Sequence, residues 1–531
     1  MTSSAQRWTS SLNRASSAST CSRSSSRTDP HTLSSGITNR PDTTLLAWPT
    51  PPTGHTEGRN WTLGGDPTVG NQQLAALMTE AGFLDPSGTI GRKRFARAVT
   101  DAGTNRGIQK TYSHTYVTRW LSGVTPRDPE TRDSITTALS RALGRTVNAA
   151  EVGYADRGKI PTDFGLMYPE DAENAVAQVS RILDADLVEE HQMRMIPTHV
   201  GAWSGASLSW LVGGRSPIAL GDQRSRVTAS DVRRLRATRD LFDRLDSQFG
   251  GGHARRALLE YLRDDLPSLL RSGAPASVQR DLFSAAAEAT QLAAWMSYDA
   301  GHHGMAQRYF IQALGLAGAA DDRVLAASIL DSMSHQATFL GHFKEAANMA
   351  RAARLGAAGV STPILSAHFH TMEARALARL GHASGCDRAL SAAAKEYDRH
   401  TPGEGPGWIQ YFDEAELAAE FGHCNRDLGR AIHATTYAAQ ALGTASGQYL
   451  RSDFFATMVL AHSYVDRREV EQACDVALHA IRIGEQLKSA RCHSYVDEFR
   501  IRLSKVGDSR AVRAFTESAE GTRLWTRQPS Q

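Results

Sequence analysis

The chain has 531 residues, too many for a single hydrophobic core, so two or more domains are expected. Hydrophobic residues make up 41% and charged residues 22%, values near globular averages that exclude a fibrous or wholly disordered chain. The formal net charge of +3 points to no particular partner. The five cysteines are scattered and odd in number, which argues against a disulfide framework and fits a reducing cytoplasm. Apolar runs are too short for a membrane span or a signal peptide, so a cytoplasmic protein without membrane contact is expected.

Residues 1–68 differ in composition from the rest of the chain. Ser, Thr, Arg, Pro and Gly dominate, and the few apolar residues follow no pattern. Such a segment cannot bury enough apolar area to offset its ordering entropy, so it is predicted to be a disordered tail. A start codon assigned too far upstream is the other interpretation, and it is slightly favoured.

Residues 69–156 are predicted to form a small helical domain. Four apolar patterns with helical spacing occur there, at about 74–81, 95–99, 113–121 and 135–143. Ser113 is a plausible N-cap of the third helix, and Gly82, Gly123 and Gly144 follow helix ends. The segment from 91 to 119 is basic, with seven Lys and Arg against Asp101, a net charge of +6. Charge concentrated in this way is typical of a surface that contacts nucleic-acid phosphates.

The third predicted helix, Ser113–Leu121, is the candidate for reading DNA bases. Val117, Trp120 and Leu121 share one face and should pack inward, while polar side chains occupy the other sides. The segment from Val117 to Gly123 resembles the recognition helix of phage-repressor-like helix-turn-helix proteins. The predicted DNA-binding residues are Arg94, Arg97, Lys110, Ser113, His114, Thr115, Thr118 and Arg119, with Arg94, Arg97 and Lys110 on the phosphate backbone.

The connection between the second and third helices departs from that family. About a dozen residues, Asp101 to Tyr112, replace a tight turn of about four. This leaves open a basic helical bundle that binds no DNA.

The rest of the chain is predicted to be helical as well. Residues 157–228 are interpreted as a linker with one helix opened by Pro169, and 229–290 as a helical lead-in to a repeat array. Within the lead-in, helices at about 230–248 and 253–271 flank Gly250-Gly251-Gly252, which is interpreted as a flexible turn rather than a phosphate-binding loop. Residues 506–531 are predicted to be a C-terminal tail.

Residues 291–505 contain an internal repeat. The pair Gly-His recurs at 301, 341, 381 and 422, at intervals of 40, 40 and 41 residues. Two columns of small residues follow the glycines and predict a stack of helical hairpins, with close contact between the two helices of each hairpin. The first column is Ala306, Ala346, Cys386, Ala431 and Ala473, and the second is Ala313, Ala353, Ala393, Ala438 and Ala480. The repeat signature is therefore Gly301, Ala306, Ala313, Gly341, Ala346, Ala353, Gly381 and Ala393.

The first repeat of this array resembles a tetratricopeptide repeat. Trp295, Tyr298, Gly301, Ala306 and Phe310 match the aromatic and small-residue marks of that family. HEAT-like hairpins are the competing interpretation because the period exceeds the usual 34 residues. The histidines after the glycines are interpreted as turn or cap residues, since equivalent positions lie about 10 Å apart and metal ligands must converge on one ion. No metal site is expected.

The order of these domains resembles one bacterial group. Residues Asn71–Tyr154, the Phe249–Arg256 stretch, the Leu143–Gly153 segment and the repeats are similar to actinobacterial tetratricopeptide regulators of sporulation and antibiotic production. The resemblance implies a transcriptional regulator, with repression of differentiation or secondary metabolism as the expected role. It implies nothing enzymatic, and the residues contain no catalytic motif or cofactor signature.

The expected protein is all-α and binds DNA as a homodimer, associating with the nucleoid when bound. Its array is expected to bind a peptide or protein, by analogy with peptide-pheromone receptors of the same domain order. The alternative is a repeat adaptor that does not bind DNA and regulates through protein contacts. An enzyme, the third possibility, would need a copurifying cofactor or metal.

Overall fold

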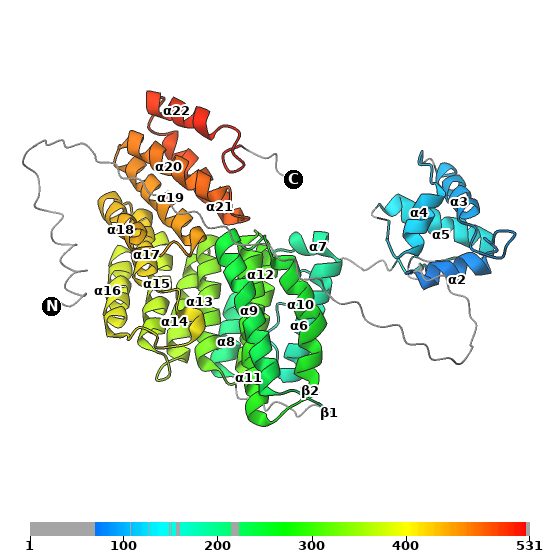
Figure 1. Cartoon of the computed structure of the whole chain (residues 1–531), viewed down its shortest axis with the longest axis horizontal. Helices are drawn as coiled ribbons and strands as arrows, with labels where there is room; N and C mark the ends of the chain where they lie inside the picture. Colours follow the sequence, from blue (N-terminus) through cyan, green and yellow to red (C-terminus); the bar gives the residue numbers. More distant parts are fainter. Residues whose placement is uncertain are drawn as a thin grey trace, which may run out of the picture. The chain divides into compact units, whose positions relative to one another are not determined.

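The computed structural model describes residues 70–526 except 107, 127, 148, 150, 155–159 and 214–221. The described residues form two units, 70–160 and 161–526 (Figure 1). The predicted all-α class is confirmed, since the described strands amount to β1 (Asp222–Arg226) and β2 (Ser272–Gly273), a parallel pair. The predicted tail at 1–68 lies outside the described residues.

The first unit is a bundle around one core. Its helices are α2 (Gln72–Glu80), α3 (Arg92–Thr104), α4 (His114–Leu121) and α5 (Pro129–Leu143). Phe95, Trp120 and Ile135 are buried at its centre, one from each of the last three helices. The side chain of Asn71 accepts a hydrogen bond from the backbone N–H of Leu74 and donates one to the carbonyl of Val152. The start and the end of the unit are thereby joined.

The second unit opens with packed helices, so the prediction of a linker with one helix at 157–228 is wrong. This stretch contains α6 (Ala172–Val188), α7 (Glu190–Arg194) and α8 (Val200–Val212). Helix α6 begins after Asp171, whose carboxylate accepts from the backbone N–H of Asn174, and not at Pro169. Sequence periodicity missed α8 because its residues are apolar or small on all sides.

Glycines within later helices explain how this opening segment packs. A Cβ at Gly315 would lie 2.2 Å from Pro169 Cγ, and a Cβ at Gly356 would lie 2.0 Å from the ring of Trp210. Both glycines therefore leave room for a side chain of the opening segment. The buried Arg308 adds hydrogen bonds to the carbonyls of Phe164 and Pro197. The segment is thus fixed to the array and does not act as a free linker.

A hairpin of α9 (Ala229–Phe249) and α10 (Arg255–Arg271) precedes an array of five helical hairpins and two further helices among the described residues (Figure 1). The hairpins are α11 (Ala276–Asp299) with α12 (His303–Ala319), α13 (Arg323–Phe339) with α14 (Phe343–Gly356), α15 (Pro363–Arg379) with α16 (Ala383–Arg399), α17 (Glu414–Asp427) with α18 (Ala431–Thr444), and α19 (Leu450–Asp466) with α20 (Val470–Gly484). The two further helices are α21 (Ala490–Leu503), which packs on α19, and α22 (Arg510–Ala519). Helix α22 packs on α20 through the buried Phe515, so residues 506–526 complete the array, and the predicted tail at 506–531 is wrong for this part.

The turns inside the hairpins follow one backbone pattern. Gly301, Gly341 and Gly381 each adopt a positive φ, between 72° and 89°. The fourth turn uses Gly429 (φ 70°), and the fifth uses Arg468 (φ 66°). A residue with a Cβ in this region is uncommon, because the side chain crowds the backbone.

The predicted register of the fourth repeat, which contains α17 and α18, is wrong. Gly422 and His423 lie inside α17, not in a turn, because residues 400–413 with the short helix η1 (Gly407–Ile409) lengthen this unit. The interval between turn residues is therefore 48, from 381 to 429. The small residues of the fourth unit are accordingly Ala434 and Ala441, both buried, in place of Ala431 and Ala438. Ala306, Ala313, Ala346, Ala353 and Ala393 are buried at the contacts between helices.

The two ends of the array meet at the glycine triplet Gly250-Gly251-Gly252. The N–H of Gly252 donates to the carbonyl of Lys488 at 2.9 Å, and the N–H of Gly251 donates to Asp299 Oδ2 at 2.8 Å. A Cβ at Gly251 would lie 2.7 Å from the carbonyl oxygen of Met296. The turn between α9 and α10 is thus tightly docked and is not the flexible turn predicted. Helix α9 also packs against α11 and α19, so the array closes around its interior.

Candidate functional site

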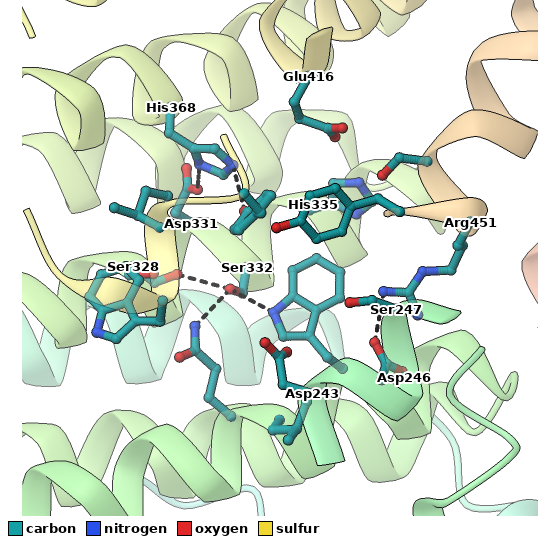
Figure 2. Close-up of a pocket in the computed structure, with 18 of the residues that line it drawn as sticks. Asp243, Asp246, Ser247, Ser328, Asp331, Ser332, His335, His368, Glu416 and Arg451 are labelled. Atoms are coloured by element: carbon teal, nitrogen blue, oxygen red, sulfur yellow. Dashed lines mark hydrogen bonds and ion pairs between the residues drawn. The ribbon is translucent and has the colours of Figure 1, made fainter. Parts of the chain in front are cut away.

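The interior of the array contains a cavity of about 240 Å³ (Figure 2). Its walls come from α9, from the first helix of each hairpin and from α21, and residues 407–411 of the insertion contribute as well. This cavity is called the central pocket below. Because it needs both ends of the array, it depends on the closure at the glycine triplet.

Aromatic side chains contribute to the pocket surface. Trp295, Trp408, Tyr411, Tyr449 and Phe455 line it. The indole N–H of Trp295 donates to Ser332 Oγ at 3.2 Å, and the amide of Gln291 donates to the same oxygen at 3.0 Å (Figure 2). These bonds fix the orientation of the indole, which offers a flat apolar surface to a bound group.

A chain of three side chains ties the insertion to the pocket wall. His368 Nδ1 lies 2.5 Å from Asp331 Oδ2, and His368 Nε2 lies 3.0 Å from the hydroxyl of Tyr411. Burial would lower the pKa of His368, but the neighbouring Asp331 carboxylate outweighs this effect and raises it. The arrangement holds residues 407–411 over the pocket, since Tyr411 belongs to the insertion and His368 to α15.

The arginines of the pocket are paired with carboxylates. Arg451 contacts Asp246 at 2.7 Å and Asp299 at 3.4 Å. Arg491 lies 3.7 Å from Asp299, and its guanidinium stacks over the ring of Phe455. These pairs link α9, α11, α19 and α21, so they reinforce the closure of the array.

Glu416 differs from the other charged groups of the pocket. Among the described residues, no cationic side chain forms an ion pair with its carboxylate. Burial and the nearby Glu420 raise the pKa of Glu416 to about 7. Glu420 itself is paired with Arg375 at 2.8 Å. Glu416 is therefore a carboxyl group without a counter-ion in a partly buried position.

A column of polar and aromatic residues marks this interior in the sequence. Each of the five turn residues is preceded, six positions earlier, by a polar or aromatic residue. These residues are Trp295, His335, Arg375, His423 and His462. Burial lowers the pKa of His462 to about 3, so this imidazole is neutral. Sequence analysis missed the column because the fourth unit was aligned on Gly422 instead of Gly429, seven residues out of register.

The predicted DNA-reading residues lie on the surface of the first unit. Val117, Trp120 and Leu121 are buried, whereas Ser113, His114, Thr115 and Arg119 are exposed and Thr118 is half-buried. Ser113 occupies the N-cap position of α4, but its side chain makes no capping hydrogen bond. The Thr118 hydroxyl donates to the carbonyl of His114. Tyr116, which sequence analysis left out, is 48% exposed on the same helix.

The predicted backbone contacts fall into different environments. Arg97 is exposed on α3, and Arg94 donates to the carbonyl of Gly82 at 3.3 Å. Lys110 instead forms ion pairs with Asp128 and Glu130 at 3.0 Å, and Arg106 pairs with Asp133. The charge of +6 counted over 91–119 is thus partly offset by carboxylates at and within α5, which come later in the sequence.

The two units still differ in the sign of their charge. Residues 70–160 contain 13 Lys and Arg against 8 Asp and Glu, and residues 161–531 contain 40 against 44. The excess of positive charge therefore resides in the unit that carries α4. Within the described part of the chain, no helix has the length and apolar character needed to cross a membrane.

Comparison with known proteins bears on the first unit. The family model of the SP15 N-terminal domain matches residues 74–155, which include α3 to α5 and all but the first two residues of α2. No curated protein and no solved structure matches the chain. The chain is therefore similar to that domain family over its first unit.

Proposed function

We propose that the protein is a transcriptional regulator that binds DNA through α4 and a peptide or protein ligand through its helical array. The observation that carries the proposal is the outer face of α4, where Ser113, His114, Thr115 and Arg119 are exposed on a unit with excess positive charge. Short polar side chains and an arginine are the groups that reach base edges in the major groove. Repression of differentiation or secondary metabolism is the role that the resemblance to actinobacterial regulators implies.

Two copies of the chain would bind one operator. Helix α4 has eight residues, so a single copy reads few base pairs. The array contributes ligand binding through the central pocket, and the ligand would act by favouring one arrangement of the dimer over another.

A repeat adaptor that binds no DNA is the second candidate. It is favoured by the pairing of Lys110 and Arg106 with carboxylates of the same unit, which reduces the charge available to phosphates. In this account α4 would contact a protein.

Selection of genomic DNA fragments by the purified full-length protein, followed by sequencing over a salt series, separates the two candidates. The wild type is compared with Arg119→Ala and with Arg145→Ala, whose guanidinium is already paired with Glu151 and Glu80. We expect one enriched motif for the wild type and Arg145→Ala, and its loss in Arg119→Ala. Binding without a motif that fades with salt would refute operator recognition and favour the adaptor.

A further inference from the structure

The central pocket has more carboxylates than basic groups to match them. Its lining includes five carboxylates, Asp243, Asp246, Asp331, Glu416 and Glu420, against three arginines, Arg239, Arg451 and Arg491. Two of these arginines are shared with Asp299, a sixth carboxylate at the end of α11. Glu420 is matched by Arg375, which leaves Glu416 as the carboxyl group without a basic partner among the described side chains.

Two deeply buried carboxylates of the lining have spare hydrogen-bonding capacity. The side chains of Asp331 and Asp246 are each 3% exposed. Each pairs through Oδ2, to His368 and to Arg451 respectively (Figure 2). The Oδ1 atom of each has no hydrogen-bond partner among the described residues. Unsatisfied buried acceptors are costly, and these two oxygens add to the unmatched acceptor capacity behind this wall.

Aromatic side chains line the same cavity as these carboxylates. Trp295, Trp408 and Tyr411 line the same cavity as Asp331 and Glu416. A cation between an aromatic face and a carboxylate gains both a cation–π interaction and a charge-assisted hydrogen bond. An anionic ligand would meet the excess negative charge and be repelled.

We propose that the central pocket binds the ammonium or guanidinium group of a ligand, with Glu416 as its counter-ion and the Trp295 indole beside it. The group could belong to a basic side chain of a peptide or to a free small amine, since the recognised chemistry is the same. The inference rests on the proposed ligand-binding function of the array and names the chemical class of the ligand. A cavity of about 240 Å³ accommodates one such group with a short aliphatic stem.

The raised pKa of Glu416 gives the inference a pH signature. The carboxyl group faces Glu420 on its own helix, Asp413 before it, His368 from α15 and Ser452 from α19. A bound cation favours the ionised form, so binding should release a proton near pH 7. Below that pH Glu416 becomes protonated, and the loss of its charge weakens the binding of a cation.

Isothermal titration calorimetry of the full-length protein tests this inference. The probes are acetylarginine amide, which carries its charge on the guanidinium alone, and its neutral isostere acetylcitrulline amide, named arginine amide and citrulline amide from here on. Gly-Arg-Gly and agmatine then separate a peptide from a free amine, and acetylglutamate is the anionic probe. We expect arginine amide to bind about tenfold or more tightly than citrulline amide, a difference of one charge-assisted contact. Its affinity should fall about tenfold between pH 7.5 and pH 5.5.

Glu416→Gln and Glu414→Gln form the matched pair of variants. Glu414 is exposed on the same helix and does not line the pocket. Glu416→Gln should lose about tenfold in affinity for arginine amide and release no proton, whereas Glu414→Gln should behave as the wild type. Equal binding of the two amides, tighter binding of acetylglutamate, or no binding of any cationic probe would overturn the inference. These outcomes leave the DNA selection unaffected, because that experiment depends on α4.

Discussion

The two units of the molecule use polar residues in opposite ways. In the first unit the apolar side chains form the core, and the hydrogen-bonding groups of α4 point to solvent. In the array the interior itself is polar, with the buried Asp246 and Asp299 both paired with the half-buried Arg451. A surface of exposed polar groups suits a long partner such as DNA, whereas an enclosed polar cavity suits a small group that must lose its water. This difference is the basis for proposing separate tasks for the two units.

The first way to sharpen this comparison is to unfold one unit without the other. Trp120→Ala removes a buried indole from the core of the first unit and should cost about 3–5 kcal/mol. Hydrogen exchange measured by mass spectrometry should show loss of protection in residues 70–160 and unchanged protection in 276–519. Thr118→Ala, on the outer part of the same helix, is the control and should change stability by less than about 0.5 kcal/mol. Equal loss of protection in the array would show that the units do not fold separately.

The array should instead be sensitive at its closure. In Gly251→Ala the new Cβ would lie 2.7 Å from the carbonyl oxygen of Met296 and 2.8 Å from its Cα, so the backbone must shift. We expect a loss of about 1–3 kcal/mol, measured by thermal unfolding of the array. Gly443→Ala in α18, where no atom lies within 4 Å, should gain up to about 1 kcal/mol. An unchanged melting temperature for Gly251→Ala would mean that the ends of the array are not tightly joined.

The charges of the first unit can be compared by salt dependence. Arg97 is exposed, whereas Arg106 is paired with Asp133. Arg97→Ala should reduce the slope of log affinity for DNA against log salt by about 1, and Arg106→Ala should change it less. Binding titrations on one duplex over 50–200 mM salt measure both slopes. Equal slopes for the two variants would place the phosphate contacts elsewhere.

The smallest expected effect concerns a single turn of the array. Arg468 adopts a φ of 66°, where the equivalent turns have glycine. Arg468→Gly should therefore stabilise the protein by about 0.5–1 kcal/mol, because the strain of the left-handed conformation is relieved. Arg467→Gly, at a φ of −84°, should destabilise it. Chemical denaturation that ranks the two variants in the reverse order would contradict this account of the turn.

The sequence predicts the parts of the fold that depend on local patterns. The four helices of the first unit and the turns at Gly301, Gly341 and Gly381 follow from apolar spacing and glycine position. Helix α8 could not be predicted from hydrophobic periodicity because it has no polar face. The fourth hairpin was predicted in the wrong register because residues 400–413 are an insertion. As a result Gly422, which was expected in a turn, lies inside α17.

The central pocket could not be predicted because its residues are distant in sequence. Asp246 and Arg451 are 205 positions apart, and they meet since the array closes on itself. The pairing of Lys110 with Asp128 and Glu130 could not be predicted for the same reason, although these residues are fewer positions apart. A charge count over 91–119 omits α5, which supplies the opposing carboxylates. By contrast, the inward face of α4 depends on residues one turn apart and is predictable.

The most direct test of the account is the ratio of two affinities for DNA. Full-length wild type and Arg119→Ala are titrated with the selected duplex and with a scrambled duplex at one salt concentration. A sequence-specific regulator should prefer the selected duplex by about 10³ or more, and loss of one base-reading arginine should reduce that preference about 10–100-fold. A ratio near one for the wild type, or an unchanged ratio in Arg119→Ala, would contradict the proposal that α4 reads an operator.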